Sequence, residues 1–394
     1  MQSNRFQLFL TIAGLGMLVT GVFLWGQRSQ QQAQSVDGQV VTATQPSNLG
    51  MESEEPQLQV PLDETVEEQK LVVAAILANG TFFLRDIYEK SIGVIGANGL
   101  INAVHTADPT CHDRGHDLGK VIYARLQNIG SALRTCEDAC YSGCMHGVLM
   151  EAFGGDDREQ HEHSAEELDF HFHVDFDQIK ASVEELCSDP AVLVSYPEGD
   201  CLHGVGHALM TITDYDVPET IKLCEELYND GPRRYYCATG AFMEYNNING
   251  QRDYETKPLF YPCDENKYPG ACFRYKLVPV FAIHYRDKKS AQALIEKCLE
   301  LDRYHRLGCF HGVGNANMPH IVREQVDFED ICNFGSKDDQ YMCIEGAIER
   351  MAKYHPDIAP MRCDTLQETW KRELCNQGVA NGMYSLDKPF DLYL

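Results

Sequence analysis

The sequence predicts an all-α fold: about eight helical hairpins with a period of about 35 residues, forming a disulfide-linked α-solenoid or closed helical array after an N-terminal transmembrane helix. Three observations predict this fold. Cysteines recur at a regular interval along most of the chain. Most of them have a second cysteine shortly upstream, and one long uncharged apolar run lies near the N-terminus.

The apolar run extends from Gln7 to Trp25 and is long enough to cross a bilayer as one helix. A cleaved signal peptide is the alternative. Both readings put the folded domain in the periplasm or outside the cell, and the first makes the chain a single-pass membrane protein. We expect a short cytoplasmic N-terminus at 1–6, a transmembrane signal-anchor at 7–26, a flexible Gln- and Ser-rich linker at 27–60 and an extracytoplasmic cysteine-rich helical-repeat domain at 61–394.

Composition excludes one class of partner and supports the export prediction. The 394 residues include 33 basic and 59 acidic side chains, for a net charge of −26. Nucleic-acid binders neutralise phosphates with clustered Lys and Arg, so we expect no nucleic-acid partner. The 16 cysteines favour an oxidising compartment. In a reducing compartment, the alternative, the C-x-H pairs would instead form thiolate–imidazole zinc sites.

Eight cysteines open similar segments, separated by 33, 57, 36, 35, 37, 34 and 32 residues: Cys111, Cys144, Cys201, Cys237, Cys272, Cys309, Cys343 and Cys375. Seven of them follow another cysteine across a short polar turn between two helical stretches. A disulfide across that turn would join the two helices of a hairpin. The sequence predicts six such bonds: Cys187–Cys201, Cys224–Cys237, Cys263–Cys272, Cys298–Cys309, Cys332–Cys343 and Cys363–Cys375. The other four cysteines, Cys111, Cys136, Cys140 and Cys144, can pair in three ways.

Across about residues 105–385, the chain resembles tetratricopeptide proteins in repeat length and hairpin design. The tetratricopeptide signature W-x-x-L-G…Y is absent, so the similarity is one of design.

When the eight segments are aligned on these cysteines, two of the positions that follow the cysteine show a pattern. The third position after the cysteine is glycine in six segments, which indicates close approach of neighbouring helices. The second position after the cysteine therefore lies beside the contact between two neighbouring helices. From Cys144 onward it reads His146, His203, Thr239, Arg274, His311, Glu345 and Gln377. Histidines inherited as packing groups are one explanation for this column, and a shared binding site is the other.

Two histidine pairs favour the binding site. His203 and His207, like His112 and His116, are four residues apart, so each pair lies on one helical face and can bind one metal ion. With His146 they predict a transition-metal site for Zn, Fe or Cu.

The 57-residue interval carries an acidic insertion with two H-x-H pairs. These are His161, His163, His171 and His173. The insertion leaves the segment of His146 and returns at that of His203, so we expect a lid or additional ligands. A solvated acidic loop is the alternative.

We therefore expect a metal-dependent enzyme or a metal-handling protein. If it is an enzyme, Asp113 and Glu151 are the candidate catalytic proton acceptors, since H-D-R-G-H has the form of a zincin motif with Asp for Glu. The alternative is a non-catalytic solenoid scaffold that binds a protein partner at the cell envelope. In that case Glu345 and Gln377 would contact the partner.

Overall fold

The computed structural model describes residues 62–79, 84–109, 111–137, 139–154, 176–284 and 287–388. Within these ranges the chain is all-helical, without strands. The expected cytoplasmic N-terminus, membrane anchor and linker lie outside them. Among the described helices, none combines the length and apolar character needed to span a membrane.

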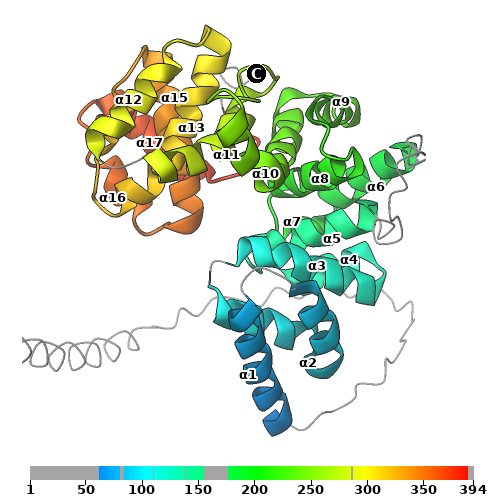
Figure 1. Cartoon of the computed structure of the whole chain (residues 1–394). Coiled ribbons are helices and arrows are strands. Elements are labelled where there is room, and N and C mark those ends of the chain that lie inside the picture. Colours follow the sequence, from blue (N-terminus) through cyan, green and yellow to red (C-terminus); the bar gives the residue numbers. More distant parts are fainter. Residues whose placement is uncertain are drawn as a thin grey trace, which may run out of the picture. The chain divides into compact units, whose positions relative to one another are not determined.

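Two sets of helices alternate along the chain (Figure 1). After α1 (Leu62–Asn79) and α2 (Leu84–Ala107), the long helices are α3 (His112–Leu126), α5 (Gly143–Gly154), α8 (Glu198–Ile212), α10 (Gly231–Thr256), α11 (Pro269–His284), α13 (Arg303–Val322), α15 (Lys337–Tyr354) and α17 (Thr369–Asn381). The helices between them are called the short helices here, although α6 is as long as α17. They are α4 (Ile129–Cys136), α6 (Phe176–Ser188), α7 (Pro190–Leu193), α9 (Val217–Leu227), α12 (Lys288–Cys298), α14 (Phe328–Cys332) and α16 (Ala359–Cys363). Each long helix packs against the next one in this order, so their inner faces are covered by their own neighbours.

Eight cysteine pairs lie at disulfide distance, and most join a short helix to the long helix that follows it. They include all six pairs predicted from the spacing. The remaining four cysteines pair as Cys111–Cys140 and Cys136–Cys144. Seven of the eight bonds close short loops of 8 to 14 residues. Each such closure stabilises the hairpin by on the order of 3 kcal/mol.

Glycine sets the distance between successive long helices. A Cβ atom on Gly240 of α10 would lie 1.8 Å from the carbonyl oxygen of His203 on α8, and one on Gly147 of α5 would lie 1.9 Å from that of His116 on α3. These contacts confirm the close helix approach predicted from the glycine column. Backbone therefore touches backbone at the residues next to the predicted metal ligands.

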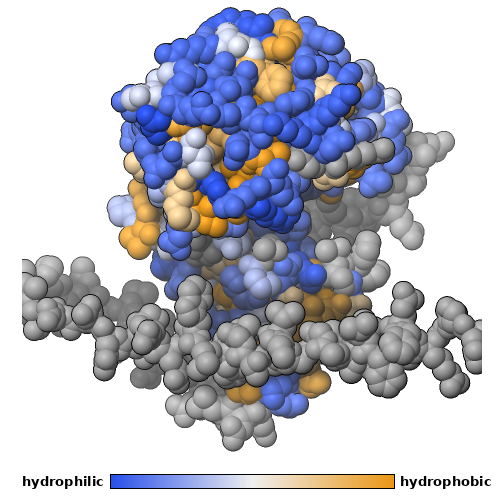
Figure 2. Space-filling view, turned by 90° about the vertical axis from the view of Figure 1, so that its left-hand side faces the viewer, coloured by the Kyte–Doolittle hydropathy of each residue, from blue (hydrophilic) through white to orange (hydrophobic). Residues whose placement is uncertain are grey.

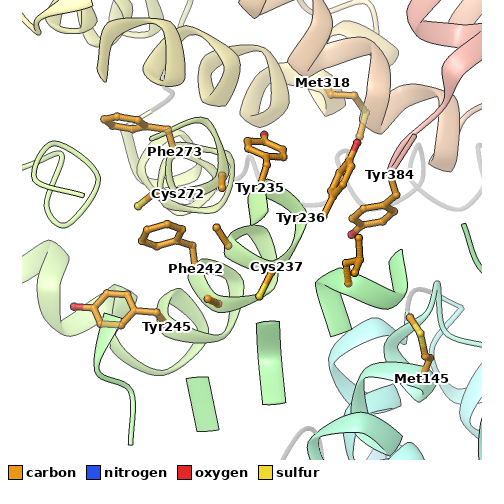
Figure 3. Packing of buried hydrophobic residues seen from close by; sticks show 14 of the residues in the cluster. Met145, Tyr235, Tyr236, Cys237, Phe242, Tyr245, Cys272, Phe273, Met318 and Tyr384 are labelled. Atoms are coloured by element: carbon orange, nitrogen blue, oxygen red, sulfur yellow. The ribbon is translucent and has the colours of Figure 1, made fainter. Parts of the chain in front are cut away.

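The C-terminal part of the chain returns to its earlier helices. Lys353, at the end of α15, contacts Ser142 at the start of α5 with 3.2 Å between Nζ and Oγ. Beyond α17, the Tyr384 ring lies beside the Tyr236 ring of α10, with centroids 5.7 Å apart (Figure 3). The Tyr236 hydroxyl donates a hydrogen bond to the Ser385 carbonyl. These contacts join segments more than a hundred residues apart in sequence.

The glycine contact predicts unequal effects of two substitutions in α10. Gly240→Ala places a methyl group inside the His203 carbonyl, so we expect a loss of at least about 3 kcal/mol in unfolding free energy. Gly250→Ala is the matched control, because its nearest neighbours are side-chain atoms of Asn246 at 3.6 and 3.8 Å. Helix propensity should then raise stability by about 1 kcal/mol. Denaturant unfolding with the disulfides intact measures both, and equal effects would contradict the packing described here.

Candidate metal centre

Five histidine rings from three consecutive long helices converge in the interior. His112 and His116 come from α3, His146 from α5, and His203 and His207 from α8. Neighbouring ring centroids in this cluster lie 4.8 to 5.6 Å apart. These are the five residues for which the helical spacing predicts one shared site, and the structure brings all of them together.

The five-histidine cluster is shielded from water. His146, His203 and His207 are fully buried, His116 is 8% exposed and His112 is half-buried. Buried polar groups need partners, because each unsatisfied one costs on the order of 1–3 kcal/mol. The hydrogen bonds of the ring nitrogens therefore show which atoms the protein leaves for a ligand.

Hydrogen bonds assign the proton on three of the rings. His112 Nδ1 lies 3.0 Å from the carbonyl oxygen of Tyr141, which can only accept, so Nδ1 carries the proton. His203 Nδ1 lies 2.7 Å from Thr239 Oγ1, whose own proton goes to the Tyr236 carbonyl. His203 Nδ1 is therefore also the donor.

His207 follows the same pattern, since its Nδ1 lies 2.9 Å from a carboxylate oxygen of Glu244 on α10. When a neutral imidazole is protonated at Nδ1, its Nε2 atom carries a lone pair. The Nε2 atoms of His203 and His207 lie 3.1 Å apart. Two facing lone pairs repel each other unless a cation, either a proton or a metal ion, lies with them. His112 Nε2 is buried and has no hydrogen-bond partner among the described residues.

His146 lies beside a buried carboxylate. Its Nε2 is 3.6 Å from Asp200 Oδ1, beyond hydrogen-bond length, and neither of its ring nitrogens has a hydrogen-bond partner in the described part of the chain. The other oxygen of Asp200 contacts Ser142 and Lys353. Burial would raise the pKa of Asp200, but Lys353 and the interactions with His146 and Ser142 together hold that pKa well below its usual range.

Burial keeps most of the rings neutral at physiological pH. It is the largest cause that lowers the pKa of His146 to about 3 and that of His112 to about 4. Burial, reinforced by the neighbouring imidazoles, also lowers the pKa of His116 and of His203 well below the usual value. Neutral imidazole is the form that binds metal ions, so the site is ready for a metal without prior loss of a proton.

Overlapping groups of donor atoms could hold a metal ion here. One comprises His112, His116 and His146, and the second comprises His146, His203 and His207. A third contains His116, His207 and Glu244. In each group the donor atoms lie within 4.8 Å of one another. Sequence reasoning missed Glu244 and Asp200, because single carboxylates carry no signal in so acidic a chain.

The other predicted site residues are placed differently. Asp113 is exposed on the first turn of α3, and Glu151 pairs with Arg85 at 3.0 Å. Neither belongs to a metal-binding group among the described residues. The four insertion histidines, His161, His163, His171 and His173, lie outside the described residues. The group of His105, Cys111 and Cys140 lacks thiolates, because its cysteines form a disulfide.

A second buried cluster occupies the C-terminal half. His311 Nε2 lies 3.1 Å from Glu345 and 3.4 Å from Glu349. Arg274 pairs with Glu349 at 2.9 Å, and Lys388 contacts both carboxylates. Two permanent cations thus neutralise two carboxylates without a metal ion.

This cluster also corrects one expectation from the sequence. Glu345 is 3% exposed, so the prediction that this side chain contacts a protein partner is wrong. Its negative charge is instead paired with positively charged side chains inside the protein. Gln377, the other residue of that prediction, is exposed.

Fold and site together define an all-helical, disulfide-linked protein with buried histidine-rich groups that could hold a metal ion. No protein-family model, curated protein or solved structure matches the chain.

The lowered histidine pKa values predict acid sensitivity of the metal-free protein. As pH falls from 6.5 to 4.5, the unfolded chain takes up protons that the buried rings of His112 and His146 do not. Stability should therefore be full above pH 6.5 and fall by up to about 1.4 kcal/mol per pH unit for each such histidine. Denaturant unfolding after chelation measures this loss. His146→Gln should show a shallower loss, and a flat stability profile in the parent would contradict the assignment.

Proposed function

We propose that the chain is a membrane-anchored extracytoplasmic protein whose five-histidine cluster holds a transition metal, as a metal-dependent enzyme or a metal-handling protein. The observation that carries the proposal is the pair of Nε2 atoms of His203 and His207, which lie 3.1 Å apart while the Nδ1 atom of each ring is already engaged by another group. Histidine ligands of metals commonly donate the other ring N–H to a carboxylate or another acceptor, as these two do.

The donor set narrows the choice of metal. Imidazole with carboxylate suits zinc, copper and iron better than calcium or magnesium, which take oxygen ligands. Thiolate ligands are unavailable, because the chain has no free cysteine. The proposed ion is therefore Zn, Cu or Fe bound through nitrogen.

A neighbouring pocket supports exchange or chemistry at the site. It has a volume of ≈ 230 Å³, and Asp200, Lys353 and Tyr384 are among its lining residues. Asp200 also lies beside His146, and the Tyr384 ring is 5.2 Å from that of His203. Asp200 is therefore closer to the rings than Asp113 or Glu151, and its lowered pKa keeps it as a negative charge beside them. The pocket therefore brings a small substrate next to Asp200 and Tyr384, which contact the cluster, although none of the five histidines lines it.

Architecture and location are part of the proposal. We interpret the successive long helices as units of a closed helical array, supported by their packing order and by the return of the C-terminal segment. The membrane anchor at 7–26 stays a prediction from the apolar run. The disulfide pairs favour an oxidising compartment on the far side of that anchor.

The alternative is a non-catalytic scaffold with a protein partner. The face shown in Figure 2 is mostly hydrophilic, with hydrophobic residues in smaller patches. That pattern favours no particular docking surface over the buried site. A scaffold would use the histidines for packing alone.

The proposal predicts metal bound by the histidines. The full chain, exported to an oxidising compartment and purified without added metal, should contain stoichiometric Zn, Cu or Fe by elemental analysis. His203→Ala with His207→Ala should lose most of it, whereas His320→Ala, at a half-buried position on α13 outside the cluster, should keep it. Absence of metal in the parent, even after reconstitution, would leave the scaffold as the better account.

A further inference from the structure

We propose that the five-histidine cluster is a two-metal centre in which His146 lies between the ions and binds both of them. This inference rests on the proposed metal-binding function and specifies how many ions the site takes.

One ion cannot use all five histidines. Metal–nitrogen bonds are about 2.0–2.1 Å long, so two donors on the same ion lie at most about 4.2 Å apart. In the described part of the chain, no group of mutually close donor atoms contains all five rings. His112 and His116 group with His146, whereas His203 and His207 form a separate group with the same His146. A third group joins His116 and His207 with Glu244 and so crosses between these two. With Glu244 kept in its hydrogen bond with His207, the five rings divide into two triads that share His146.

His146 has the chemistry of a shared ligand. Both of its ring nitrogens are buried without a hydrogen-bond partner among the described residues, unlike the rings whose Nδ1 is already engaged. The nearest charged group is Asp200, whose Oδ1 lies 3.6 Å from Nε2, so an ion bound at Nε2 would lie next to this carboxylate. Its ring centroid lies 5.1 Å from that of His112 on one side and 4.8 Å from that of His203 on the other. An imidazole that gives one nitrogen to each ion releases its ring proton to water and becomes an imidazolate.

Surrounding charges suit two divalent ions. The bridging imidazolate, Glu244 beside His207 and Asp200 beside His146 supply three negative charges within or next to the cluster. Lys353 offsets part of the charge of Asp200 on its pocket side. Each ion then has three imidazole ligands and an open position, which is the arrangement of catalytic rather than structural zinc sites.

Metal stoichiometry tests the number of ions. The full chain, stripped by chelation and reloaded with Zn(II), should bind two ions per chain by elemental analysis. The double substitutions His112→Leu with His116→Leu, and His203→Leu with His207→Leu, should each leave one. One ion in the parent would overturn the two-ion inference and keep the proposed function, whereas none would overturn both. His320→Ala is the control and should bind two.

Copper tests the shared ligand. Two Cu(II) ions joined by an imidazolate couple magnetically, so the reloaded parent should give an electron paramagnetic resonance signal far below two spins per chain. His146→Gln should show one spin for each copper that it still binds, with circular dichroism confirming that it folds. Two bound coppers with a full two-spin signal in the parent would overturn the bridge. A substitution that abolishes folding leaves the parent signal itself as the deciding result.

Discussion

Backbone contact between consecutive long helices is the constraint on which the site depends. It occurs at four of the six glycines that follow the recurring cysteine by three residues, as at Gly147 and Gly240, whereas the nearest atoms to Gly204 and Gly378 belong to side chains. A larger residue there would push the helices apart and separate the histidine rings that lie beside these glycines. Disulfides hold the short helices against the same long helices, so the spacing is fixed from both sides. The five-histidine cluster is thus a consequence of how the long helices pack.

The same two positions after the recurring cysteine hold histidines in the N-terminal half of the chain and carboxylates in the C-terminal half. Positions two and six after Cys201 are His203 and His207, while the same positions after Cys343 are Glu345 and Glu349. The carboxylates are neutralised by Arg274 and Lys388, so that cluster is complete as an internal ion-pair network. The N-terminal cluster instead presents buried imidazole nitrogens without hydrogen-bond partners among the described residues and has no such pair of neutralising cations, so it is the better candidate for binding a metal ion.

Local features of this chain were predictable from sequence, and long-range ones were not. The histidine pairs depend on a separation of four residues within one helix, and the six disulfides on separations of 9 to 14 residues across one turn, so both follow from local geometry. The Cys111–Cys140 bond spans 29 residues, across α3 and α4, and no spacing rule selects it. The contact of Lys353 with Ser142 depends on how every intervening helix packs. Asp113 has the spacing of a catalytic residue, but it falls on the exposed side of its helix.

X-ray absorption at the edge of the bound metal tests the central claim most directly, because it reports the ligand atoms themselves. The account predicts a nitrogen shell at about 2.0–2.1 Å with the outer scattering of imidazole rings, and no sulfur shell near about 2.3 Å. A sulfur shell would mean that cysteines described here as paired bind the metal instead. A shell of oxygen alone, without imidazole scattering, would place the ion outside the five-histidine cluster and contradict the account.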